Sequence, residues 1–424
     1  MRIPRILLYC TLICTAIPSD LPKLPEPYQT LADLARGAPP EFTADALLRV
    51  VERGKLSDPA ARRQLIEEAF RSAAAAKFTV AMQGLPGTTT DTASGSLNRA
   101  YSLKLDVLSL ESRAVRDLLP IDPASARKLF GDIARPMFSP LSCDDALVYD
   151  LSPFYQVLGA VVDSTFDRKQ RAKNEHLTFL ADYLEQASSP QEIAPLAQII
   201  QSAGVTPQQR EGLWASLGGL LENMLADNRS FSASLTSLNL PELQSSFEKY
   251  RSKNHACDTD SNGKKASTPK LDLYWQSATS KQLLEAGKKL RYSPSDTPLS
   301  ETDRATPEWQ QQVATYLNYL DGWSADQENS ETDYYHEKSN VLMALIELVP
   351  AGPLNDRLLA DYVDFVGNSN LYRQSPAEWF EEPRRLLERL EPNKIVHAKI
   401  LEAYQKSGNP VLSLEVALER LLDR

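Results

Sequence analysis

The sequence predicts an all-α protein of stacked antiparallel helical hairpins, an architecture similar to an α-solenoid. Three observations lead to this class: a helix-start dipeptide that recurs along the chain, apolar residues at helical spacing, and very few strand-like alternations. A closed helical toroid and a pair of separate helical bundles are the alternatives that the same observations allow.

The recurring dipeptide is a polar capping residue followed by proline. Proline suits the first helical position because the N–H that it lacks would have no partner there. The preceding side chain can accept a hydrogen bond from a free N–H of the first turn. The dipeptide occurs at Asp58-Pro59, Asp122-Pro123, Ser152-Pro153, Ser189-Pro190, Thr206-Pro207, Thr306-Pro307, Ser375-Pro376 and Asn409-Pro410. Each of these is expected to begin a helix.

Between these starts, apolar residues recur three and four positions apart, as over residues 213–224, 342–349 and 414–421. This spacing places them on one face of a helix, so each helix must pack that face against a neighbour. Trp309 and Trp379 lie in the first turns of proline-started helices and are expected to pack in the core. Short turns between the predicted helices are typical of antiparallel hairpins.

The N-terminus has the pattern of a secretory signal peptide, assigned to residues 1–19. Arg2 and Arg5 form a positive region, and the apolar run from Ile6 to Ile17 is shorter than the roughly 20 residues that span a membrane. No later segment approaches that length. We therefore expect an exported protein, periplasmic or extracellular, with no transmembrane segment in its mature chain.

Composition excludes one class of partner. The 424 residues carry a formal net charge of −10, and 24% of them are charged. A protein that binds nucleic acid usually shows a basic stripe, so the acidic balance argues against a nucleic-acid partner.

A polar tract at residues 254–270 interrupts the helical pattern. We expect it to link an N-terminal helical lobe, residues 20–253, to a C-terminal helical lobe, residues 271–424. Cys257 lies in this tract, and Cys143 is the other cysteine outside the leader. In an oxidising compartment the two thiols can form a disulfide, but the sequence leaves open whether they pair or stay separate.

The C-terminal hairpin, Ala398 to Leu422, resembles a tetratricopeptide-type repeat. Leu401, Tyr404 and Gly408 fall at the spacings that such repeats use to pack their two helices. The small alanine expected in the second helix is a serine here, Ser413. The resemblance covers only this hairpin, and it implies an α-solenoid that presents a concave surface to a protein or peptide.

Residues 318–338 combine carboxylates with aromatic side chains. Such a stretch could act on a carbohydrate, with aromatic faces stacking on the sugar and two carboxylates doing acid–base chemistry. The candidate catalytic residues are Asp321, Asp326 and Glu337, and the candidate ligand-binding residues are Trp323, Tyr334 and Tyr335. The other interpretation is an acidic loop between helices whose aromatic residues pack inward.

Two patterns resemble metal-binding motifs but lack a required ligand. The calcium candidates are Asp258, Asp260 and Asn262. The twelfth position of that loop should be a glutamate and is Pro269, so a plain surface turn is the other interpretation. His336 begins an H-E-x-x-H pattern, but the second histidine is replaced by Asn340. We therefore expect neither a metal nor a cofactor.

The function expected from these patterns is that of an exported, non-enzymatic helical-repeat scaffold that binds a protein or peptide partner. A helical carbohydrate-active enzyme or glycan binder, using residues 318–338, is the alternative. The sequence does not identify the partner.

Overall fold

The computed structural model describes residues 24–84, 92–135, 138–142, 145–202, 204–224, 240–253, 278–293, 295, 297–325 and 330–422. Over these residues the protein is mostly helical, with one small two-stranded sheet. The predicted helical class is therefore confirmed, and the sheet is an addition to it. The predicted signal peptide and the polar tract at 254–270 lie outside the described residues.

The helices up to residue 253 make up what we call the N-terminal part. They are α1 (Tyr28–Arg36), α2 (Pro40–Arg53), α3 (Pro59–Ala73), α4 (Ala93–Ser102), α5 (Val107–Leu118), α6 (Pro123–Asp132), α7 (Ser152–Ser164), α8 (Arg168–Ala172), α9 (Glu175–Glu185), η1 (Pro190–Glu192), α10 (Ile193–Ser202), α11 (Pro207–Asn223), η2 (Pro241–Leu243) and α13 (Gln244–Lys253).

The helices from residue 278 onward make up the C-terminal part. They are α14 (Ala278–Arg291), α15 (Glu301–Arg304), α16 (Pro307–Asp321), α17 (Glu331–Leu348), α18 (Pro353–Gly367), α19 (Leu371–Gln374), α20 (Pro376–Leu390), α21 (Lys394–Lys406) and α22 (Pro410–Leu422).

All eight capping-residue–proline dipeptides stand at the beginning of a helix, the one at residues 189–190 opening the short helix η1. The expected cap forms at six of them; Asp58, for example, accepts a hydrogen bond from the amide of Ala60. Ser152 is instead the first residue of α7, and its amide donates to Oδ1 of Asp150. Ser375 makes no side-chain cap. The dipeptide therefore marks helix starts more reliably than it identifies the capping group.

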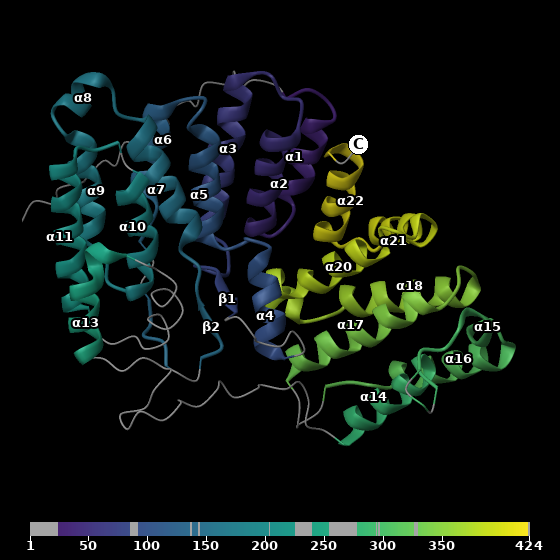
Figure 1. Cartoon of the computed structure of the whole chain (residues 1–424). Helices are drawn as coiled ribbons and strands as arrows, with labels where there is room; N and C mark the ends of the chain where they lie inside the picture. Colours follow the sequence, from purple (N-terminus) through teal and green to yellow (C-terminus); the bar gives the residue numbers. More distant parts are fainter. Residues whose placement is uncertain are drawn as a thin grey trace, which may run out of the picture.

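The two parts differ in the direction of their helices. Most helices of the N-terminal part stand side by side with their axes roughly aligned, whereas α17, α18 and α20 lie at a steep angle to them (Figure 1). Helix α4 packs on α20 and α17 of the C-terminal part, and α22 packs on α1 and α2. Segments far apart in the sequence are thus joined in two places.

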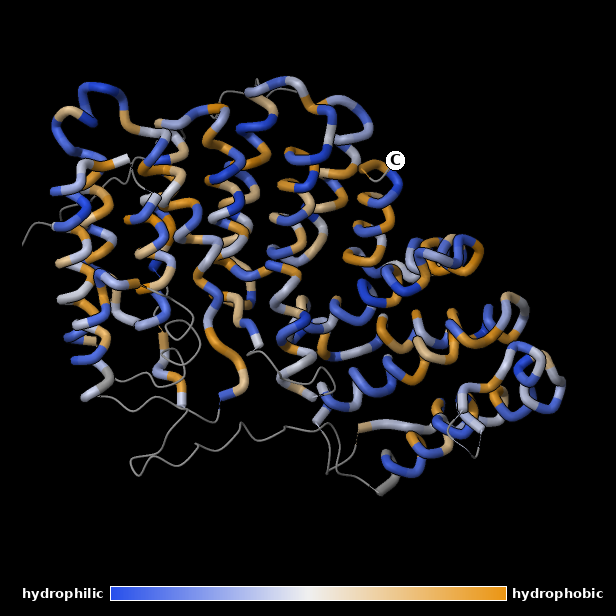
Figure 2. Tube along the Cα trace, viewed as in Figure 1, coloured by the Kyte–Doolittle hydropathy of each residue, from blue (hydrophilic) through white to orange (hydrophobic). Residues whose placement is uncertain are grey.

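Buried apolar residues from both parts form the hydrophobic core. Hydrophobic and hydrophilic positions alternate along most helices (Figure 2), as expected when one face of each helix is buried. Trp309 and Trp379 are buried, as expected. Each indole N–H finds a main-chain acceptor: Trp309 donates to the carbonyl of Leu290 at 3.0 Å, and Trp379 donates to that of Val366 at 2.8 Å. These hydrogen bonds let the tryptophans fill the core without leaving a buried donor unpaired.

The sheet consists of β1 (Met82–Gly84) and β2 (Leu147–Tyr149), which pair antiparallel with Met82 opposite Tyr149. Strands of three residues are too short to show the alternation by which strands are found in a sequence. The amide of Gly84 donates to Oδ1 of Asn98 on α4 at 2.6 Å. The sheet therefore connects α4 to the segment that leads into α7.

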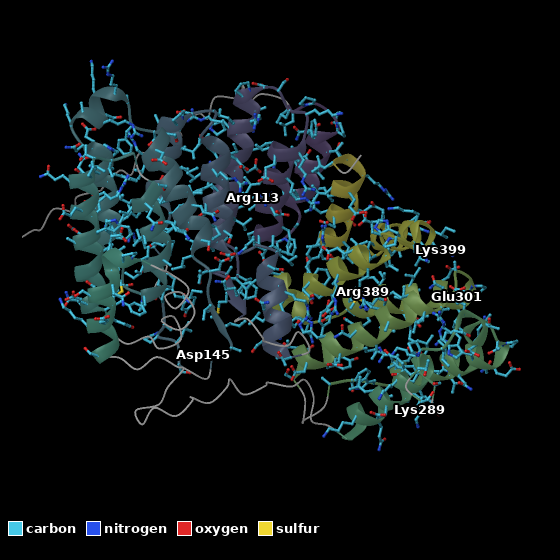
Figure 3. The ribbon with its side chains drawn as sticks, in the orientation of Figure 1. Arg113, Asp145, Lys289, Glu301, Arg389 and Lys399 are labelled. Atoms are coloured by element: carbon cyan, nitrogen blue, oxygen red, sulfur yellow. The ribbon has the colours of Figure 1, made fainter. Side chains whose placement is uncertain are left out.

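Charged side chains pair across neighbouring helices on the outside of both parts. Arg113 of α5 contacts Asp45 and Glu52 of α2, at 2.5 and 2.7 Å. In the C-terminal part, Arg389 and Lys399 make similar contacts with carboxylates of other helices. Figure 3 shows the arginines and the lysine among the surrounding side chains. The pairs of Arg389 and Lys399 are half-exposed and add little stability, whereas those of Arg113 are mostly buried.

Candidate functional site

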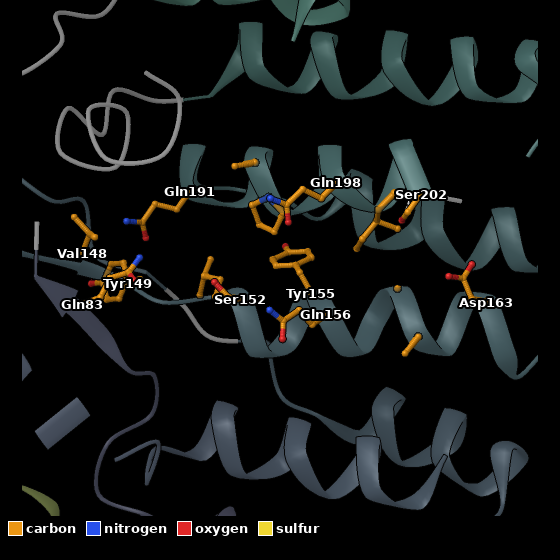
Figure 4. A pocket seen from close by; sticks show the side chains of 16 residues that line it. Gln83, Val148, Tyr149, Ser152, Tyr155, Gln156, Asp163, Gln191, Gln198 and Ser202 are labelled. Atoms are coloured by element: carbon orange, nitrogen blue, oxygen red, sulfur yellow. Dashed lines mark hydrogen bonds between the residues drawn. The ribbon is translucent and has the colours of Figure 1, made fainter. Parts of the chain in front are cut away.

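A groove of about 740 Å³ lies between α7 and α10 (Figure 4). Helix α7 directs one face into it, because the residues concerned are three and four positions apart. The residues of α7 that line the groove are Ser152, Tyr155, Gln156, Gly159, Ala160 and Asp163. Those of α10 are Ala194, Pro195, Gln198, Ile199 and Ser202. The groove thus follows α7 along nearly its whole length.

Gly159 has no side chain and leaves the surface of α7 open at the bottom of this groove. A β-carbon at Gly159 would lie 3.5 Å from Cγ1 of Ile199, so the two helices approach closely at that point. On its other face α7 buries Phe154, Leu158 and Val161 in the core. The apolar packing beneath the groove is therefore complete, and the groove is a surface feature above it.

Four glutamine side chains line the groove from three directions. Gln156 comes from α7 and Gln198 from α10, while Gln83 of β1 and Gln191 of η1 lie at the end next to the sheet (Figure 4). Among the described residues, the structure gives none of these four amide side chains a hydrogen-bond partner. An amide can donate and accept, so the row offers both functions to a ligand.

Glu192, the residue after Gln191, is fixed by three hydrogen bonds. The main-chain amides of Ser188 and Ser189 donate to Oε1 of Glu192 at 2.7 and 2.9 Å, and Tyr155 donates its hydroxyl hydrogen to Oε2 of the same carboxylate. The side chain of Gln191 itself is only 6% exposed, and its Oε1 has no hydrogen-bond donor among the described residues. A buried carbonyl oxygen without a donor costs about 1–3 kcal/mol, so Gln191 is a strained polar contact beside the groove.

The groove is almost free of charge. Asp163, at the end far from the sheet, is the one carboxylate among the residues that line it. Burial and the adjacent Glu192 carboxylate raise the pKa of Tyr155 well above its ordinary value, so this tyrosine stays neutral. Recognition in the groove must therefore rest on hydrogen bonds and shape.

The structure describes two of the three predicted catalytic carboxylates, Asp321 and Glu337. Asp321 ends α16, where it is largely exposed and lies 3.2 Å from a guanidinium nitrogen of Arg357. Glu337 is half-buried within α17, and Asp326 lies outside the described residues. Asp321 does line a hollow of about 470 Å³ with Tyr334, but Glu337 is not among the residues of that hollow.

The aromatic residues of the same stretch pack mainly into the core. Trp323 is buried and meets Tyr334 edge to face, with ring centroids 5.5 Å apart. Tyr335 is fully buried and donates its hydroxyl hydrogen to the carbonyl of Trp379 at 2.6 Å. That carbonyl lacks its helical partner because residue 383 is a proline inside α20. Trp323 and Tyr335 therefore lie where we expect them for an acidic loop whose aromatic residues pack inward.

The other candidate residues fall outside the described chain. The calcium candidates Asp258, Asp260 and Asn262 lie there, as do both cysteines of the possible disulfide, Cys143 and Cys257.

A second polar centre surrounds His336, which is fully buried on α17. Its Nδ1 lies 2.7 Å from Oε1 of Glu382, and its Nε2 lies 3.5 Å from Oε1 of Glu378. Oε2 of Glu381 lies 3.9 Å from the same Nδ1, while Nε of Arg99 on α4 donates to its Oε1 at 2.6 Å. All three glutamates belong to α20. We call these five side chains the His336 cluster.

The contacts within the His336 cluster determine which of its side chains carry a proton. Burial alone would lower the pKa of His336, but hydrogen bonds to Glu378 and Glu382 outweigh it and raise the pKa to about 9. Burial and the adjacent Glu382 carboxylate raise the pKa of Glu381 to about 8. The hydrogen bond from His336 lowers the pKa of Glu382 despite complete burial. A protonated imidazole therefore lies against an ionised carboxylate at neutral pH.

Sequence reasoning missed both the groove and the cluster. The three glutamates at positions 378, 381 and 382 are spaced to share a helix face, which is a detectable signal. Nothing in the sequence connects them to His336, which lies more than forty residues away on another helix. The four glutamines of the groove are likewise scattered between residues 83 and 198.

No family model, curated protein or solved structure matches this chain. Among the described residues, every helix is too short or too polar to cross a membrane.

Proposed function

We propose that this protein is an exported, non-enzymatic helical-repeat scaffold that binds an extended peptide segment of a partner protein in the groove between α7 and α10. Successive helices pack as neighbours along the N-terminal part, among them α2 on α3, α5 on α6 and α10 on α11. An α-solenoid of such pairs, with the groove on its surface, is part of this proposal. The leader-like residues 1–19 support export.

The observation that carries the proposal is the pair of exposed amide side chains, Gln156 and Gln198, that face each other across the groove. Neither side chain has a hydrogen-bond partner within the described chain, so both are available to a ligand. Peptide N–H groups are donors that every partner sequence offers. The exposed amides of Gln156 and Gln198 can then pair with peptide carbonyl and N–H groups, whatever the side chains of the peptide are.

The length of the groove also suits a peptide. Lining residues run from Ser152 to Asp163 on α7. That stretch rises about 16 Å at 1.5 Å per residue, which matches about five residues of extended chain. Because the floor around Gly159 and Ile199 is apolar and Asp163 is the one carboxylate, we expect the bound segment to be uncharged or to carry a basic residue at one end.

Selection from a random peptide library displayed on phage would test the proposal. We expect enriched peptides to bind the wild-type chain and to lose affinity for a Gln156→Ala/Gln198→Ala double variant by about tenfold or more. This expectation assigns at least about 0.5–1.5 kcal/mol to each lost hydrogen bond. Fluorescence anisotropy with the labelled peptides would give the dissociation constants.

A matched control is available on the same helix. Gln201→Ala removes an exposed amide of α10 that does not line the groove, so it should leave peptide binding unchanged. Ala160→Tyr would fill the groove without touching its glutamines and should abolish binding. Peptides that bind the Ala160→Tyr variant as tightly as wild type, or a library that yields no enriched peptide, would refute the proposal.

A further inference from the structure

We propose that His336, Glu381 and Glu382 bind one divalent transition-metal cation, with Zn²⁺ as the best-suited ion. One ligand atom from each of the three lies within 4.8 Å of the others. The ligand set joins an imidazole nitrogen to two carboxylate oxygens, a combination that suits Zn²⁺ and its first-row neighbours better than Ca²⁺ or Mg²⁺.

The strongest sign that this site suits a cation is a pair of buried carboxylate oxygens. Oε2 of Glu381 and Oε2 of Glu382 are buried and have no hydrogen-bond donor within the described chain. Glu382 is fully buried and Glu381 is 4% exposed, so water cannot solvate these atoms as it would at the surface. Two adjacent carboxylates in such a setting need a proton or a cation between them.

The arginines of the site leave room for that cation. Arg99 holds Oε1 of Glu381, so the other oxygen of that carboxylate, Oε2, is the one near Nδ1 of His336. Arg385 approaches Oε2 of Glu382 only to 3.5 Å and is itself partly exposed. Three glutamates therefore face two arginines and the imidazole of His336, and a bound Zn²⁺ would take the place of the proton on that imidazole.

Binding would exchange protons for the metal. The short contact between Nδ1 of His336 and Oε1 of Glu382, 2.7 Å, contains a hydrogen that the cation would displace. Ser96 of α4, whose Oγ lies 2.8 Å from the same nitrogen, could supply a further oxygen. Glu378 is the most exposed of the three glutamates, with 13% of its side chain accessible. The bound metal would tie α17 to α20 directly beneath α4.

Isothermal titration of Zn²⁺ into the tag-free full chain, stripped with EDTA, would test this site. We expect one Zn²⁺ per chain, and a loss of affinity of more than about tenfold in His336→Gln and in Glu382→Gln. The matched control is His397→Gln, because His397 lies 3.8 Å from Glu419 in a half-buried histidine–glutamate pair on other helices, α21 and α22. This control should bind Zn²⁺ like wild type.

A second measurement does not depend on the variants folding. Co²⁺ added to the stripped wild-type chain should give visible d–d absorption bands that an equimolar amount of Zn²⁺ removes. Wild-type protein that binds no Zn²⁺ and shows no such bands would overturn the proposal, since a proton alone would then occupy the cluster. Zn²⁺ binding that His336→Gln leaves intact would overturn it too, because the ion would lie elsewhere. Neither result bears on peptide binding in the groove.

Discussion

Glu111 gives a prediction whose size follows directly from the structure. It lies on α5 with 4% of its surface exposed, and its Oε2 has no hydrogen-bond donor among the described residues. Burial alone raises the pKa of this carboxyl from 4.5 to about 7. The folded protein therefore holds the proton more tightly than the unfolded chain does.

Because of this difference, Glu111 makes the stability of the folded protein depend on pH. Below about pH 4.5 the carboxyl is protonated in both states, and Glu111 imposes no electrostatic penalty. As the pH rises from about 4.5 to about 7, the unfolded chain releases the proton while the folded protein still holds it, so stability falls across that range. The rise of the pKa from 4.5 to about 7 corresponds to a full penalty of about 3 kcal/mol.

Glu111→Gln removes this penalty while keeping the shape of the side chain. We expect the variant to be more stable than wild type by up to about 3 kcal/mol at pH 8, and by little at pH 5. Urea unfolding followed by circular dichroism at both pH values would measure the difference. Glu185→Gln, at an exposed position of α9, should show no such pH dependence. Equal effects of Glu111→Gln at pH 5 and pH 8 would refute the reasoning.

Three further substitutions test contacts in the C-terminal part, each by urea unfolding. Tyr335→Phe should cost about 1–3 kcal/mol, because it leaves the carbonyl of Trp379 without a donor; no loss would mean that water reaches that carbonyl. Asn355→Ala should cost about 2 kcal/mol, because its buried amide donates to two carbonyls at the end of α17. Glu415→Gln should cost about 3–5 kcal/mol, because the buried Arg49 loses its 2.8 Å partner; a neutral effect would show that Arg49 is solvated.

The fold could be predicted from the sequence to the extent that it is encoded locally. A capping residue and a proline act within one helical turn, so the starts at positions such as Thr206 and Thr306 could be identified from the sequence alone. Trp309 and Trp379 follow such starts and are buried as expected. The two three-residue strands could not be predicted, because their pairing joins residues 82–84 to residues 147–149 and leaves no periodic signal in the sequence.

Candidate sites depend on contacts between residues far apart in the sequence, and patterns within a single segment cannot predict such contacts. Trp323 and Tyr335 have the side chains that a sugar site would use, but one follows α16 and the other lies in the first turns of α17, so both pack between helices. The His336 cluster takes one residue from α17, one from α4 and three from α20. No spacing within a single segment could show that these helices meet.

Helix α4 connects the two candidate sites physically. Its Asn98 binds the end of β1, whose Gln83 lines the groove, and its Arg99 holds Glu381 in the His336 cluster. Buried polar contacts of this kind contribute less to stability than to the choice of one arrangement, because the desolvation of charged groups offsets most of their attraction. The cluster therefore acts to fix where α4 sits on α17 and α20. Through α4 it also fixes how the N-terminal part, with its groove, is set against the C-terminal part.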